Sequence, residues 1–208
     1  MIALKANTQR EATKAKKKLY VKYMLSLRCE KNAKSELINL GLRHIISDNA
    51  IILLGNVTED QLDALKENLK MAGLELLDEP DSMLIDRIIT SIHEIVHDSD
   101  QLPNITYEEI INKKIVLGSE HILKIFSEVK GLSILHYIVL QKIEKVKELL
   151  LYSDLSLPEI AGRLHYKNKH SLTAQLRKFT GLTPDYFRKI KRKRERNLNR
   201  NQETSNRN

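Results

Sequence analysis

Two short amphipathic helices joined by three residues are predicted within residues 154–188, and this pairing constrains the fold more than any other feature of the chain. Ser156 with Glu159 forms a capping box that begins a helix at 156–164, and Asn168 begins a second helix that ends before Gly181. The apolar positions recur at helical spacing, so they lock the two helices together: Ile160, Ala161, Leu164, Leu172, Leu176 and Phe179. One polar face of the second helix must then remain exposed.

That polar face carries the candidate DNA contacts. Side chains at the N-terminal end of such a helix reach base edges in the major groove, and cations beyond them meet phosphates. The candidate base readers are Lys169, His170, Ser171, Thr173 and Ala174. The candidate backbone contacts are Arg177 and Lys178, with Lys191, Arg192 and Lys193 from the basic run at 189–196. Periodicity alone is satisfied equally by a helical hairpin with a solvated charged face.

The same residues resemble the signature of AraC-type transcription regulators. The matching stretches are 155–161 and 172–188, and their most specific part is Gly181-x-x-Pro184-x-x-Phe187-Arg188. The resemblance extends over about 82–190 and implies an all-helical domain (81–190) with two helix-turn-helix units joined by a helix at about 132–152. About twenty helical residues rise about 30 Å, close to one turn of DNA. The resemblance therefore implies a sequence-specific regulator that binds double-stranded DNA.

The chain departs from the family pattern in ways that affect DNA reading. His165 and Tyr166 stand where the family usually has glycine and phenylalanine, and Ala174 stands where it often has a long polar reader. By the same matching, the first recognition helix is 119–130, and its DNA-facing residues are Glu120, Leu123 and Lys124. Acidic and apolar readers beside phosphates are poor, so the first unit is expected to read weakly. The second unit, about 156–181, is expected to be the main reader.

A smaller α+β domain is predicted over residues 18–80. A strand at 19–27, a helix at 30–39, a hairpin of strands at 44–46 and 50–54, a helix after the Thr58 capping box and a strand at 74–77 follow in order. This βαββαβ order predicts a ferredoxin-like fold. Met24-x-Ser26-x-x-Cys29 loosely resembles the metal loop of heavy-metal-associated domains, but Ser26 removes one thiolate, so the site is degenerate and no metal or cofactor is expected.

Two alternatives to a DNA-binding regulator remain open. His93-Glu94-Ile95-Val96-His97 has the H-E-x-x-H spacing of a zinc hydrolase, but no third ligand follows and the segment falls on a helix predicted at 83–97. The prediction is therefore that the protein is not an enzyme. The other alternative is an interaction protein with a degenerate DNA-binding domain, acting through an N-terminal domain that contacts a protein partner or a second copy of the chain.

Composition and charge agree with a cytoplasmic nucleic-acid-binding protein. The formal net charge is +8, with an acidic stretch at 56–110 and a basic C-terminal end. There is one cysteine, and no apolar run approaches the roughly 20 residues of a membrane-spanning helix, so no membrane is expected as a partner. Residues 1–17 are predicted to be a basic flexible leader, and 191–208 a basic disordered tail.

Overall fold

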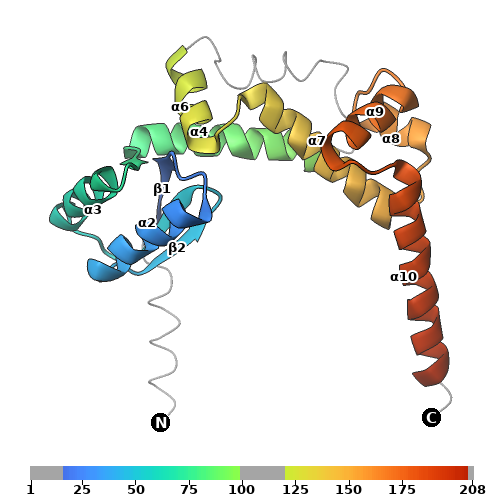
Figure 1. The fold of residues 1–208 in the computed structure, drawn as a ribbon, viewed down its shortest axis with the longest axis horizontal. Coiled ribbons are helices and arrows are strands. Elements are labelled where there is room, and N and C mark those ends of the chain that lie inside the picture. The colour runs from blue at the N-terminus through green and yellow to red at the C-terminus, as the bar shows by residue number, and fades with distance from the viewer. Residues whose placement is uncertain (1–15, 99–119, 206–208) are drawn as a thin grey trace. The chain divides into compact units, whose positions relative to one another are not determined.

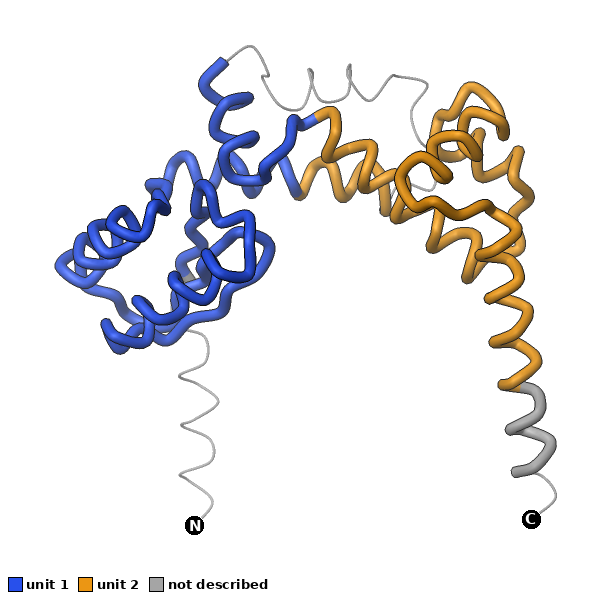
Figure 2. Tube along the Cα trace, in the orientation of Figure 1, with its two compact units in different colours: residues 1–89, 117–134 blue, residues 90–116, 135–208 orange. Residues whose placement is uncertain are grey.

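The computed structural model describes residues 16–98 and 120–205 (Figure 1). The chain divides into two compact units, residues 1–89 with 117–134 and residues 90–116 with 135–208 (Figure 2). This division differs from the predicted boundary at residues 80/81. The reason is that α4 (Glu79–His93) crosses from one unit to the other and that α6 (Glu120–Lys130) packs against the N-terminal sheet.

The first unit contains a four-stranded antiparallel sheet with helices. The strands β1 (Lys16–Lys22), β2 (His44–Ser47), β3 (Ala50–Leu54) and β4 (Glu75–Leu76) lie in the order β2-β3-β1-β4. Leu19 pairs with Ile51 and Val21 with Leu76, which places these four apolar side chains in one core. Helices α2 (Leu27–Asn39) and α3 (Glu59–Met71) complete that core with Leu37, Leu65 and Leu69.

Local sequence signals explain most of the element ends in this unit. Thr58 and Gln61 form the predicted capping box of α3. Asp48 and Asn49 adopt φ values of 53° and 64°, as a two-residue hairpin turn requires, so the predicted hairpin is confirmed. The predicted limits of the first strand and helix are wrong: β1 ends at Lys22 and α2 begins at Leu27, because the Ser26 side chain caps α2 by accepting from the Cys29 amide at 3.3 Å.

The remaining elements are helical. A π-helical turn (Glu94–Asp98) follows α4, and α7 (Ile134–Tyr152), α8 (Leu157–Arg163), α9 (Lys169–Thr180) and α10 (Pro184–Ser205) follow α6. The predicted disordered tail is wrong over 191–205, because α10 continues to Ser205 with neither glycine nor proline after Pro184 to end it. Residues 99–119 of the predicted helical domain and most of the basic leader lie outside the described residues. Within the described ranges, no helix combines the length and apolar character needed to cross a membrane.

Candidate nucleic-acid interface

Helices α8 and α9 form the second helix-turn-helix unit, and both begin at the predicted caps. Ser156 and Glu159 form a capping box on α8, and the Asn168 side chain accepts from the amides of His170 and Ser171 at the start of α9. Leu172 and Leu176 are fully buried in one core with residues of α7, α8 and the start of α10. The inner face of α9 is thus fixed, which determines which side chains point outward.

The turn between α8 and α9 is built differently from a glycine turn. His165 adopts a φ of 51°, a left-handed conformation that costs a residue with a Cβ atom free energy. Tyr166 donates a hydrogen bond of 2.6 Å from Oη to Gln175 Oε1 on α9, and Lys142 Nζ of α7 lies 4.3 Å from the centre of its ring. Burial lowers the pKa of Lys142 to about 8, and burial followed by the charge of Lys142 lowers the pKa of His165.

The structure brings four of the five predicted base readers together on the outer face of α9. Lys169, His170 and Ala174 are exposed, and Thr173 is partly exposed with its Oγ1 donating to the Lys169 carbonyl at 2.8 Å. Ser171 is engaged in capping instead: its Oγ accepts from the Asn168 amide at 3.2 Å and donates to the Asn168 carbonyl at 2.8 Å. Ser171 therefore holds the start of α9 in place, and the four other side chains form the candidate reading surface.

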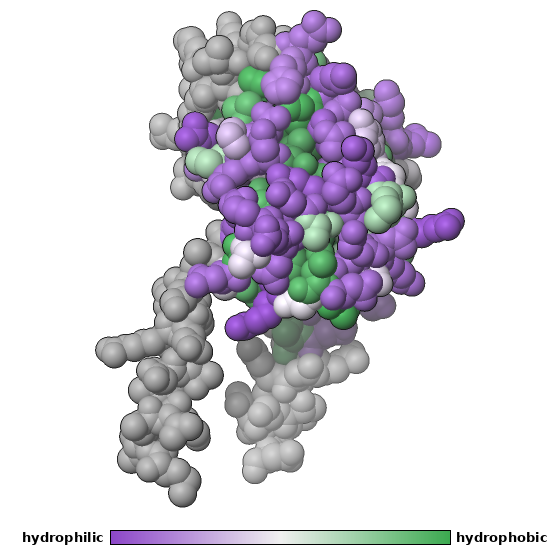
Figure 3. All heavy atoms as spheres, turned by 90° about the vertical axis from the view of Figure 1, so that its left-hand side faces the viewer, coloured by the Kyte–Doolittle hydropathy of each residue, from purple (hydrophilic) through white to green (hydrophobic). Residues whose placement is uncertain are grey.

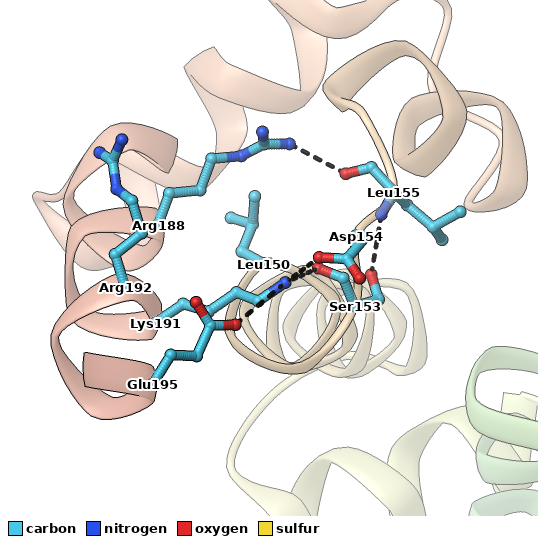
Figure 4. Close-up of a pocket in the computed structure, with 8 residues that line it drawn as sticks. All are labelled: Leu150, Ser153, Asp154, Leu155, Arg188, Lys191, Arg192 and Glu195. Carbon is cyan, nitrogen blue, oxygen red and sulfur yellow. Dashed lines mark hydrogen bonds and ion pairs between the residues drawn. The ribbon is translucent and has the colours of Figure 1, made fainter. Parts of the chain in front are cut away.

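The predicted backbone contacts divide into exposed and engaged cations. Arg177 and Lys178 on α9 are exposed, as are Arg192 and Lys193 on α10. Lys191 is engaged: its Nζ donates to the Ser153 carbonyl at 2.8 Å and pairs with Asp154, and its side chain is 16% exposed. Figure 4 shows these contacts in a shallow pocket between the α7–α8 junction and α10.

Arg188 and Arg194 add to this attachment of α10. The Arg188 Nη2 donates to the Leu155 carbonyl at 2.9 Å, and the Arg194 Nη1 donates to Tyr152 Oη at 2.9 Å. Sequence reasoning assigned neither contact, although Arg188 belongs to the family signature. The first turns of α10 are therefore attached to the end of α7 and to the segment between α7 and α8. The exposed cations Arg192 and Lys193 thus lie on a helix whose position is fixed.

Helix α6, the predicted recognition helix of the first helix-turn-helix unit, has one buried and one exposed face. Ile122, Ile125, Phe126 and Val129 are buried on one side of the helix. Glu120, Leu123 and Lys124 are exposed on the other, with Leu123 46% exposed. The candidate DNA-facing residues of this helix thus share one solvent-facing surface.

The two candidate metal segments have structural roles on the described chain. The rings of His93 and His97 stack with centres 4.4 Å apart, and His97 Nε2 lies 3.3 Å from Gln141 Oε1. Burial, and then the neighbouring His93, lowers the pKa of His97. Ser26 Oγ, the cap of α2, lies 3.2 Å from Cys29 Sγ. Among residues 16–98 and 120–205, no three His, Cys, Asp or Glu side chains are grouped so as to hold a metal ion.

Comparison with known families gives a match in the helical region. Residues 113–190 match a family described as a helix-turn-helix domain, and this range contains α6, α7, α8 and α9. The match does not include the N-terminal sheet, and the resemblance of that part to heavy-metal-associated domains is not confirmed.

Individual relatives are similar over about half of this chain. An uncharacterized HTH-type transcriptional regulator, YtdP of Bacillus subtilis (strain 168), is 28% identical over 101 residues, which are 49% of this chain and 13% of that protein. The C-terminal domain of AraT, a response regulator from Geobacillus stearothermophilus, is 24% identical with a TM-score of 0.43, covering 51% of this chain and 84% of that one. The DNA-binding domain of AdpA, solved with a target DNA, is 20% identical with a TM-score of 0.43, covering 53% and 94%.

Proposed function

We propose that this protein is a transcription regulator that binds double-stranded DNA sequence-specifically, with α9 as its main reading helix. The observation that carries this proposal is the outer face of α9. Lys169 and His170 are exposed at its N-terminal end, Arg177 and Lys178 are exposed further along, and Leu172 and Leu176 anchor the opposite face. A helix with donors at its start and cations beyond them fits the major groove of an AraC-type domain.

The chemistry of each exposed side chain determines which part of the DNA it can contact. The Lys169 ammonium can donate to guanine O6 and N7, and His170 can donate to an acceptor on a neighbouring base. The Thr173 hydroxyl is already donating to the Lys169 carbonyl, which leaves its methyl group and the Ala174 side chain to contact a thymine methyl group. Arg177, Lys178, Arg192 and Lys193 meet phosphates and add affinity without sequence information.

The test is selection of bound duplexes from a random pool by the full-length protein, followed by the same selection with Lys169→Ala. The wild-type protein is expected to enrich one sequence motif, and the variant is expected to lose preference at the base pairs that Lys169 contacts. Lys34→Ala is the matched control, because Lys34 is an exposed lysine on α2 of the N-terminal unit. Recovery of no motif by the wild-type protein, or an unchanged motif with Lys169→Ala, would contradict the proposal.

For the N-terminal unit we propose a ferredoxin-like class and a regulatory role within the same protein. Support for the class comes from the element order β1-α2-β2-β3-α3-β4 and from the strand order β2-β3-β1-β4. Figure 3 faces the side of Figure 1 on which the N-terminal unit is drawn, and it shows a mostly hydrophilic surface with small apolar areas. Met71 is 81% exposed and Leu27 is 76% exposed, and a homodimer contact or a protein partner on this unit belongs to the same proposal. A cytoplasmic location and the absence of enzymatic activity belong to the same proposal.

A further inference from the structure

The C-terminal turn of α6, the first recognition helix of the AraC-type domain, is attached to the N-terminal sheet. The backbone amide of Tyr23, just after β1, donates to the Glu128 carbonyl at 2.9 Å. Lys22 Nζ lies 3.2 Å from Glu128 Oε2 and also pairs with Glu75 of β4 at 2.7 Å. The helix is therefore joined to the end of β1 by a backbone and a side-chain contact, and Lys22 also links β1 to β4.

Lys130, the last residue of α6, makes the most buried of these attachments. Its Nζ lies 2.6 Å from Asp48 Oδ1 and donates to the Asp48 carbonyl at 2.9 Å, so it holds the turn between β2 and β3 twice. The Lys130 side chain is 3% exposed, and its Nζ lies 5.6 Å from the centre of the Tyr20 ring on β1. The lysine of this ion pair is nearly buried, although the Asp48 side chain is 55% exposed. With the added hydrogen bond to the Asp48 carbonyl, the pair fixes geometry more strictly than a fully exposed pair does.

The residue that follows α6 is crowded by the same domain. Gly131 has a φ of 70°, and a Cβ atom at this position would lie 3.0 Å from both terminal carbons of the Leu25 side chain. The loop carrying Leu25 links β1 to α2, so the N-terminal domain covers the end of α6 closely. These attachments lie at the C-terminal end of the helix. At its start, His121 Nε2 lies 3.4 Å from Asp81 Oδ1 on α4, and Glu120, Leu123 and Lys124 remain exposed.

We infer that the N-terminal domain holds the first recognition helix in position. Lys130, through its contacts with Asp48, is a positioning residue for the DNA contacts of α6. The inference rests on the proposed function, because it concerns where α6 meets DNA. Contacts in recognition require placement to within about 0.5 Å, which a helix attached along one side only does not guarantee. In this arrangement, any partner or ligand that moves the β2–β3 turn also moves α6.

Two variants break the attachment in different ways. Lys130→Met keeps the bulk of the side chain and leaves Asp48, whose side chain is 55% exposed, to be hydrated. Asp48→Asn leaves the lysine without its carboxylate in a nearly buried site and is expected to act more strongly. Asp63→Asn is the matched control, because Asp63 pairs with Lys66 at 3.4 Å within α3 and both side chains are exposed.

The readout is the position of α6 on DNA. In a Cys29→Ala background, Glu120→Cys provides one exposed thiol at the start of α6, and an attached iron chelate cleaves the DNA beside it. On the duplex recovered by selection, the unaltered attachment is expected to give one narrow cluster of cuts. Lys130→Met and Asp48→Asn are expected to reduce the strongest cut by at least about threefold and to spread the pattern, and Asp63→Asn is expected to leave it unchanged.

The outcomes separate this inference from the proposed function. Hydrogen exchange of the α6 amides is measured on the same variants, and it is expected to accelerate in Lys130→Met while α9 stays unchanged. Unchanged cuts and unchanged exchange in the two variants would overturn the inference. An absence of cuts on a tightly bound duplex from the labelled Glu120→Cys protein with Lys130 and Asp48 intact would overturn it too. Failure of the selection to yield any bound duplex would instead refute the proposed function, and the inference with it.

Discussion

Replacing Lys142 with methionine is expected to stabilise the second compact unit, which contains α7, α8, α9 and α10. Lys142 lies on α7 with 9% of its surface exposed, and its Nζ lies 4.3 Å from the ring of Tyr166 in the turn of the second helix-turn-helix unit. Burial lowers its pKa from 10.5 to about 8. Methionine is similar in length and apolar, so it fills the same space without a charge to desolvate.

The size of the effect follows from that pKa. A fall from 10.5 to about 8 corresponds to about 3.5 kcal/mol at about 1.4 kcal/mol for each tenfold change in proton affinity. The attraction of the ammonium for the Tyr166 ring, which methionine loses, offsets about 0.5–2 kcal/mol of that gain. Lys142→Met is therefore expected to raise the free energy of unfolding at pH 7 by roughly 1.5–3 kcal/mol.

The sign of the pH dependence is also determined. Between pH 8 and 10.5 the unfolded state binds the lysine proton and the folded state does not, so the stability of the wild-type protein gains from rising pH in this window. Below pH 8 both states are protonated and the full cost of burial remains. The advantage of Lys142→Met over wild type should therefore shrink as the pH rises from 8 to 10.5.

Urea unfolding followed by circular dichroism at pH 7 and at pH 10 measures this difference. Lys147→Met is the matched control, because Lys147 lies on the same helix with a 31% exposed side chain paired with Glu144. Reading the difference between variant and wild type removes the titration of other lysines and tyrosines. A Lys142→Met advantage that is absent at pH 7, or the same at both pH values, would refute the assignment of the pKa to burial.

Three further changes test the second helix-turn-helix unit. Ser156→Ala removes the cap of α8 and is expected to lower the free energy of unfolding by about 1 kcal/mol in urea titrations. Leu176→Ala empties a fully buried position and is expected to cost about 2–5 kcal/mol and to abolish binding to the selected duplex at 37 °C, measured by thermal melting and by fluorescence anisotropy. His165→Gly relieves the φ of 51° and is expected to stabilise by about 1 kcal/mol. Because the folded-state pKa of His165 is lowered, wild-type stability is lost as pH falls through 6.5, and thermal melting between pH 7 and 5 should show a weaker loss in His165→Gly.

Features set by residues close in the sequence could be predicted. The caps at Thr58, Ser156 and Asn168 join residues that are two or three positions apart, and the sequence shows both partners. The turn at Asp48 and Asn49 is likewise local, since both residue types tolerate positive φ. The inner face of α9 followed from apolar spacing alone, and Leu172 and Leu176 are both fully buried.

Features that depend on distant residues or on a choice between roles could not be predicted. Lys130 and Asp48 are 82 positions apart, and neither carries a signal that they pair, so the attachment of α6 to the sheet was missed. The polarity of Ser171 and its place early in α9 predict base reading, but the same properties suit the cap that it forms. The charge of Lys191 predicts a phosphate contact, whereas its hydrogen bond to the Ser153 carbonyl depends on how α10 meets α7.

The central claim is that α9 reads bases through Lys169 and His170 while Arg177 only meets phosphates. The most direct test is the affinity of single alanine variants for the selected duplex and for a scrambled duplex at several salt concentrations. Lys169→Ala and His170→Ala are expected to cost roughly 1–3 kcal/mol on the selected duplex and much less on the scrambled one. Arg177→Ala is expected to weaken both equally and to lower the slope of log K against log salt by about 0.9. Equal losses on both duplexes for Lys169→Ala and His170→Ala would contradict the claim that α9 is the reader.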